Sequence, residues 1–169
     1  TQSKYWITIS LHALVQIKYL CSVKKSSKLL LFDDDFEAFD VIGICSGMND
    51  YRIAWNLNKA FSWQLEHSDR VLEIPQKKSK EVLTFSYYKQ LGFEEFTDLY
   101  LVKNKQLSRP LLEDYPQLDY ILIIKNNLVF DVDELVQLLR QHQQIIAAYR
   151  YDSSAFSISE YLQFEESYE

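Results

Sequence analysis

The residue pattern most suggestive of covalent chemistry is Gly43-Ile44-Cys45-Ser46-Gly47. Gly-x-Cys-x-Gly has the spacing of a nucleophile elbow with cysteine in place of serine, in which a sharp strand-to-helix turn presents the side chain beside backbone N–H groups. Such a nucleophile needs a base, and the only histidines after it are His67 and His142, neither of them in a recognisable catalytic motif. We therefore expect a strand-to-helix turn with a buried Cys45 and a capping Ser46. A small hydrolase that uses Cys45 as its nucleophile is the alternative.

Polar residues follow this turn on a predicted helix. They are Asn49, Asp50, Arg52 and Asn58, with Trp55 among them. Their functional interpretation is a binding surface, since a tryptophan beside charged and amide side chains is typical of recognition surfaces. The simpler interpretation is helix capping together with a local ion pair. Both interpretations stay open at the level of the sequence.

Two groups of residues could bind a metal ion. Asp33-Asp34-Asp35, with Glu37 and Asp40, is the densest acidic run, and clustered carboxylates can hold Mg²⁺ or Ca²⁺. Successive residues of a strand point to opposite faces, so we expect a solvated strand edge instead. His67 and Asp69 would supply only half of a site. The sequence predicts no metal site and no cofactor, because it also has no P-loop, dinucleotide fingerprint or zinc-ligand spacing.

Composition predicts an acidic globular domain. The chain has 169 residues, of which 47% are hydrophobic and 25% charged, so one domain with a continuous core is expected. The net charge is −6, and residues 1–32 carry five lysines and no acid, which leaves −11 on residues 33–169. An acidic body repels a phosphate backbone, so we expect no nucleic-acid partner. Two cysteines, Cys21 and Cys45, do not make a disulfide scaffold and indicate a reducing, cytoplasmic location.

The first part of the chain differs from the rest. Residues 5–23 are mostly apolar and long enough to be weighed as a membrane span, but His12, Gln16 and Lys18 interrupt them. We expect residues 1–27 to be an extension outside the domain, either helical or unstructured, and a membrane anchor is the alternative. Residues 28–169 are then expected to form a single domain.

Hydrophobic periodicity predicts the elements of this domain. Extended segments are expected at residues 29–32, 41–45, 70–74, 81–89, 97–103 and 119–125, of which the last, apolar on both faces, should be central in a sheet. One helix should end at about Phe61, with Ala54 and Leu57 on its buried face and Tyr51 and Trp55 on the shoulder of that face. A second should begin after Asp131 as its cap, with His142 on its apolar stripe as a hydrogen-bonded core histidine. Residues 145–151 fit a helix or a strand equally well.

With a strand at residues 145–151 the order becomes β-α-β-β-β-α-β. Consecutive strands in the middle of the chain imply antiparallel pairing. The predicted fold class is therefore α+β, a two-layer sandwich in which two main helices cover one face of an antiparallel sheet.

Two stretches carry a resemblance to a known family. Residues 42–58, with Asp50-Tyr51-Arg52 ahead of Leu57-Asn58, and residues 112–120 resemble the IPExxxVDY family, uncharacterised bacterial proteins found chiefly in Bacteroidota. The Val-Asp-Tyr of that motif corresponds to Leu118-Asp119-Tyr120, whereas its Ile-Pro-Glu corresponds to Leu112-Glu113-Asp114. The resemblance implies a domain from about residue 28 to about residue 165 and favours a strand at residues 145–151. It implies no activity, cofactor or catalytic residue.

The absence of assembled catalytic chemistry in the sequence, together with its many tyrosines and tryptophans, favours a non-enzymatic binding or protein-interaction module. The expected partner is a second copy of the chain or another protein.

Overall fold

The computed structural model describes residues 39–75, 82–94, 96–106 and 109–153. All of these lie in one compact unit of the chain, which begins at Phe36. The expected extension at residues 1–27, the apolar segment at residues 5–23, the strand at residues 29–32 and most of the acidic run at residues 33–40 fall outside the described residues.

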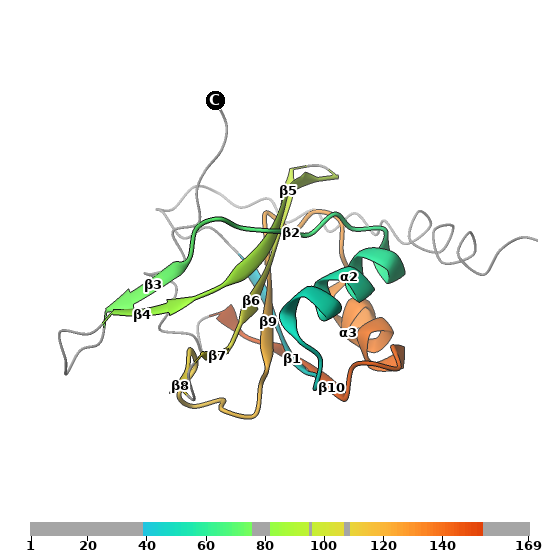
Figure 1. Cartoon of the computed structure of the whole chain (residues 1–169). Coiled ribbons are helices and arrows are strands. Elements are labelled where there is room, and N and C mark those ends of the chain that lie inside the picture. The colour runs from blue at the N-terminus through green and yellow to red at the C-terminus, as the bar shows by residue number, and fades with distance from the viewer. Residues whose placement is uncertain (1–38, 76–81, 95, 107–108, 154–169) are drawn as a thin grey trace, which may run out of the picture. The chain divides into compact units, whose positions relative to one another are not determined.

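Six strands form one antiparallel sheet in the order β10-β1-β9-β6-β5-β2 (Figure 1). Their bounds are β1 (Phe39–Cys45), β2 (Glu66–His67), β5 (Tyr87–Phe93), β6 (Thr97–Lys103), β9 (Tyr120–Lys125) and β10 (Ala147–Tyr151). Two short hairpins, β3 (Leu72–Pro75) with β4 (Val82–Phe85) and β7 (Lys105–Gln106) with β8 (Arg109–Pro110), form separate sheets. The helices α2 (Asp50–Phe61) and α3 (Val132–Gln141) lie on the same face of the large sheet (Figure 1). The predicted α+β class is therefore confirmed.

Strand β9 lies at the centre of the described sheet, between β1 and β6, as the sequence predicted for residues 119–125. Ile42 pairs with Leu122 and Val41 with Ile123, and all four side chains are at most 3% exposed. Alternation along each strand sends one member of such a run to the helices and the next to the opposite face. An uninterrupted apolar run is thus what a strand covered on both faces requires.

Both helices bury one apolar stripe. In α2 the buried residues are Ile53, Ala54 and Leu57, and in α3 they are Val132, Leu135, Val136 and Leu139. The predicted cap of α3 is present, because the Asp131 carboxylate accepts hydrogen bonds from the backbone N–H groups of Asp133 and Glu134. The cap expected at the start of α2 differs, since the Asn49 side chain makes no capping hydrogen bond there.

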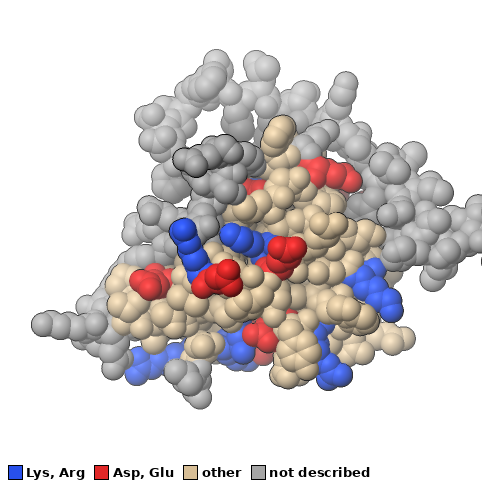
Figure 2. Space-filling model, turned by 45° about the horizontal axis from the view of Figure 1, so that its top comes forward, with Lys and Arg blue, Asp and Glu red and all other residues tan. Residues whose placement is uncertain are grey.

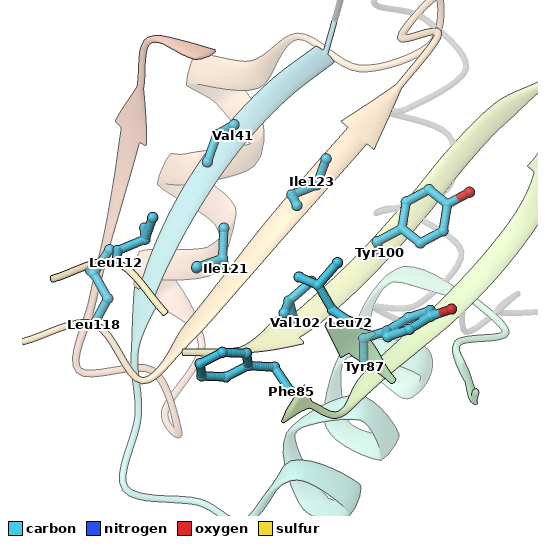
Figure 3. Close-up of a cluster of buried hydrophobic side chains, with 10 residues drawn as sticks. All are labelled: Val41, Leu72, Phe85, Tyr87, Tyr100, Val102, Leu112, Leu118, Ile121 and Ile123. Carbon is cyan, nitrogen blue, oxygen red and sulfur yellow. The ribbon is translucent and has the colours of Figure 1, made fainter. Parts of the chain in front are cut away.

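The face of the sheet away from the helices is also covered. Leu72 of β3, Phe85 of β4, and Leu112 and Leu118 of the segment before β9 pack on the sheet, as Figure 3 shows. The sheet residues beneath them are Val41, Tyr87, Tyr100, Val102, Ile121 and Ile123. The expected two layers are therefore completed by hairpin and loop residues on the second face.

The expected single strand at residues 81–89 is broken at Ser86. Its first part, β4, leaves the large sheet to pair with β3, whereas β5 continues along β6 as far as Phe93. Strand β5 therefore extends beyond the expected end at residue 89, and the connection to β6 is short. A register shift between Gln90 and Phe93 is accommodated at Gly92, whose positive φ of 63° suits glycine.

Residues 147–151 form a strand, which settles the two patterns that the sequence allowed. Helix α3 ends at Gln141, and the Ile145 N–H donates to the carbonyl of His142 in the turn that follows. Strand β10 then pairs with β1 from Cys45 to Val41. As a strand, these residues satisfy the backbone hydrogen-bonding groups on the side of β1 away from β9, which a continued helix would not do.

Candidate functional site

The turn between β1 and α2 is held by hydrogen bonds from distant parts of the chain. The buried Ser46 donates from its backbone N–H to Asp119 Oδ2 at 2.8 Å and from its hydroxyl to the carbonyl of Gln144 at 2.8 Å. The Ile146 N–H donates to the carbonyl of Cys45 at 2.9 Å. Ser46 therefore stabilises the turn. Its hydroxyl also accepts a hydrogen bond from the Met48 N–H at 3.3 Å, which is the nearest equivalent to the predicted cap.

The tripeptide Leu118-Asp119-Tyr120 contacts the end of β1 and the turn that follows it. A Cβ atom added to Gly43 would lie 2.6 Å from Leu118 Cδ1, so the glycine allows Leu118 to pack against β1. Asp119 holds Ser46 and forms an ion pair of 2.8 Å with Lys105. The Tyr120 hydroxyl donates to the carbonyl of Met48 at 2.6 Å. All three residues thus position the turn and the start of α2.

Cys45 ends β1, at the predicted strand-to-helix turn, but its surroundings do not activate the thiol. It is a free cysteine of intermediate exposure, and its Sγ donates to the carbonyl of Gln117 at 3.4 Å. Burial raises the pKa of this thiol and the Asp119 carboxylate raises it further, against an opposing effect of Lys105. A raised pKa keeps the group as the thiol, whereas a nucleophile needs the thiolate.

The structure does not bring a described histidine to Cys45. His67 lies on β2, at the other edge of the six-stranded sheet, with its ring against Tyr88 at a centroid distance of 5.1 Å. His142 follows α3 and accepts from the Gln144 N–H through Nδ1. His142 is only partly buried, so it is a local turn residue and not the core histidine that the sequence predicted.

The predicted binding residues separate into two groups. Asn58 clamps the chain after α2, since its amide donates to the carbonyl of Leu65 at 3.0 Å and accepts from the Leu65 N–H at 2.8 Å. Asp50 lies 3.9 Å from Lys103 and accepts from the Tyr51 N–H. These two residues therefore contact groups near the two ends of α2, and the ion pair of Asp50 is with the distant Lys103. Asn49, Arg52 and Trp55 are exposed.

The exposed side of α2 carries aromatic side chains. Tyr51 and Trp55 are 59% and 60% exposed, although the sequence placed them on the shoulder of the buried face. Lys59 lies over the Trp55 ring, 5.1 Å from its centroid. Residues 51, 55 and 59 follow each other at four-residue intervals and so form one stripe. We call Tyr51, Arg52, Trp55 and Lys59 the α2 surface.

The Asp50 carboxylate at the start of α2 affects two tyrosines, Tyr88 and Tyr120. Burial raises the pKa of Tyr120 far above its usual range, and Asp50, Asp119 and Tyr88 raise it further. Burial and Asp50 also raise the pKa of Tyr88. Both phenols therefore stay protonated at neutral pH and serve as hydrogen-bonding and packing groups.

The acidic run at residues 33–40, for which a solvated strand edge was expected and a metal site considered, is represented by one described residue. Asp40 accepts from the Asn127 side chain at 2.7 Å and lies 3.5 Å from Arg150 Nη2. Among the residues with described positions, no three histidine, cysteine, aspartate or glutamate side chains gather where they could hold a metal ion. His67 and Asp69 are both exposed.

Sequence reasoning missed Asn104, a completely buried polar side chain. Its amide donates to the carbonyls of Tyr115 and Leu118 at 3.1 and 2.8 Å, and its carbonyl oxygen accepts from the Leu112 N–H at 2.9 Å. Asn104 therefore holds the segment before β9 against the sheet. Its only sequence signal is an amide directly after an apolar strand.

The described surface does not gather charge of one sign on the face shown in Figure 2, where basic and acidic side chains are interspersed. Neither described helix is both long and apolar enough to cross a bilayer. In comparisons with family models, curated proteins and solved structures, none matched the chain.

Proposed function

We propose that this domain is a protein-interaction module that binds another protein chain through the α2 surface. The observation that carries the proposal is the exposure of Tyr51 and Trp55, 59% and 60%, on the side of α2 away from the core. The buried stripe of α2 consists of Ile53, Ala54 and Leu57, so the two rings lie outside the core. Tyrosine and tryptophan are enriched in binding surfaces and among the residues that dominate binding energy.

The support beneath α2 suits a recognition surface. Asp119 and Tyr120 hold the turn before the helix, and Asn58 fixes the chain after it. A helix anchored at both ends loses little conformational freedom when a partner packs on it, so more of the contact energy appears as affinity. Asp50 and Asn58, which the sequence suggested for binding, thus contribute by positioning, and the exposed aromatic residues supply the contact.

The Cys45 hydrolase remains the alternative function, tested by the thiol chemistry described in the Discussion. Our proposal includes the cytoplasmic location expected from the cysteines and membership in the IPExxxVDY family. It includes no nucleic-acid partner and no cofactor.

Site-specific photo-crosslinking tests the interaction in cells that produce the full chain. A photoreactive phenylalanine derivative replaces Trp55 in one variant and Leu128, which is 69% exposed, in a matched control. We expect a discrete adduct from position 55, identified by mass spectrometry, and none from position 128. Addition of Trp55→Ala protein to a purified complex should then fail to displace the partner. No adduct at position 55, or the same adducts at both positions, would overturn the proposal.

A further inference from the structure

We infer that the chain bound by the α2 surface is a second copy of this protein, with the two α2 helices packed antiparallel about Trp55. This inference rests on the proposed function, because it names the partner of the same surface. The evidence is the order of side chains along the stripe: an aromatic ring at position 51, another at 55 and a cation at 59.

An antiparallel pair makes this stripe complementary to itself. Residues 51 and 59 lie four positions on either side of 55, about 6 Å along the axis in each direction. A two-fold axis at Trp55 therefore places Tyr51 of each copy opposite Lys59 of the other, and the two Trp55 rings face each other. A lysine ammonium over a phenol ring is an attractive cation–π contact. A two-fold axis also makes both halves of the interface identical, as in most protein dimers.

The parallel arrangement is disfavoured by charge. It places Lys59 opposite Lys59 and Tyr51 opposite Tyr51, so two like charges meet and the cation–π pairs are lost. Lys59 already lies over the Trp55 ring of its own helix, which places its charge on the stripe.

The dimer should be weak and reversible. One 12-residue helix presents a small contact area, and interfaces below about 1,200 Å² in total are typical of transient complexes. Sedimentation velocity over loading concentrations from about 1 µM to about 1 mM covers that range of affinity. The weight-average mass should rise from the 20.1 kDa of the single chain towards twice that value.

Single substitutions test the surface. Trp55→Ala should weaken self-association about tenfold or more, the usual loss for a central aromatic residue. Leu128→Ala, at an exposed position outside α2, should leave self-association unchanged. Because both side chains are exposed, circular dichroism should show the same fold and thermal midpoint for both variants.

Charge substitutions at positions 51 and 59 test the self-association and its register. Tyr51→Lys alone puts like charges opposite each other twice, and Lys59→Glu alone removes both cation–π pairs, so each variant should dimerise poorly. Mixed together they form one Lys–Glu ion pair and retain one Lys–Tyr contact. The mixture should therefore associate more strongly than either variant alone. The doubly substituted Tyr51→Lys/Lys59→Glu chain tests the register. Antiparallel pairing places its opposite charges together twice, so association should recover, whereas parallel pairing would place like charges opposite each other at both positions.

The outcomes separate this inference from the proposed function. A single chain that stays at 20.1 kDa throughout, or a mixture no stronger than its components, overturns the antiparallel dimer. If the crosslink at position 55 then identifies a different protein, the interaction module stands and only its partner changes. If position 55 gives no adduct, both proposals fail.

Discussion

Asp119 accepts a 2.8 Å hydrogen bond through Oδ2 from the backbone N–H of Ser46, 73 residues earlier in the chain. This bond joins the residue before β9 to the turn after β1, and the other carboxylate oxygen accepts from Lys105. One side chain therefore fixes strands β1 and β9 relative to the start of α2.

Asp119→Ala should destabilise the fold by about 1–3 kcal/mol, because the buried Ser46 N–H loses its acceptor. Urea unfolding followed by circular dichroism measures the change. Asp119→Asn keeps an amide oxygen at the same position and should cost less. Lys105→Ala is the matched control for the ion pair, which is partly exposed and should contribute less than about 1 kcal/mol. Equal losses for Asp119→Ala and Lys105→Ala would contradict the assigned importance of the Ser46 bond.

Asn104→Ala should be among the more destabilising substitutions, by about 3 kcal/mol or more. It leaves two carbonyls and one N–H without their amide partners in a fully buried position. Asn56→Ala removes the hydrogen bond that the Asn56 amide donates to the Arg52 carbonyl on the surface of α2. This substitution should lower the free energy of unfolding by less than about 1 kcal/mol. Chemical denaturation gives both values. A loss at Asn104 no larger than the loss at Asn56 would show that the segment before β9 is held by other contacts.

Iodoacetamide should label Cys45 slowly in the folded protein at pH 7, at least about tenfold more slowly than in the urea-unfolded chain. Burial and Asp119 raise the pKa of the thiol, so the reactive thiolate is scarcer than in the unfolded chain. Labelling in a Cys21→Ser background reports on Cys45 alone. Asp119→Asn should increase the rate if the protein stays folded.

Rapid labelling of folded Cys45 would instead favour the hydrolase. In that case Cys45→Ala must abolish any hydrolytic activity of the protein. A Cys45→Ala protein that keeps the activity would exclude Cys45 as its nucleophile.

Alkaline pH should destabilise the protein, and Tyr120 should account for much of the effect. A tyrosine in the unfolded chain ionises near its ordinary value of 10.0, whereas the pKa of Tyr120 in the fold is raised by burial and by the nearby Asp50. The stability linked to this phenol is therefore fully present below pH 10 and is lost as pH rises towards the folded pKa, because the unfolded state releases its proton first.

Urea midpoints between about pH 8 and about pH 11 measure this dependence. Tyr120→Phe should be less stable at neutral pH by about 1 kcal/mol, since it removes the hydrogen bond to Met48, yet lose less stability as pH rises. Some dependence should remain, because the pKa values of Tyr88 and Tyr151 are also raised. An unchanged alkaline slope in Tyr120→Phe would contradict the assignment.

Local patterns in the sequence predicted the elements that depend on one apolar period. The central position of residues 119–125, the end of α2 at Phe61 and the Asp131 cap of α3 are all confirmed. Each of these features depends on side chains that are close in sequence, so a short segment of the chain is enough to predict it.

Other features depended on distant neighbours. The break at Ser86 arises because β4 pairs with β3 over the second face of the sheet, and the hydrogen bonds of Asn104 reach Tyr115 and Leu118. Residues 147–151 became a strand because of β1, more than a hundred residues earlier. A local pattern carries no record of such pairings.

For the candidate site the sequence predicted the local structure but not the roles of the side chains. The predicted strand-to-helix turn after Cys45 and the helix that ends at Phe61 are both present. It could not show that Ser46 and Asn58 would bind backbone groups, or that Tyr51 and Trp55 would face solvent. Those assignments depend on how far α2 is rotated about its axis, which the sheet beneath it determines.

The position of β1 between β9 and β10 has a consequence for how the chain folds as it is synthesised. Strand β1 is the first described strand to leave the ribosome, but both of its neighbours follow more than 70 residues later, with Val41 pairing to Ile123 and Tyr151. An apolar strand must therefore wait without partners while most of the domain is translated, and such long-range pairings slow folding and expose chains to aggregation. The nascent chain is thus most in need of chaperone protection between the emergence of β1 and that of β10.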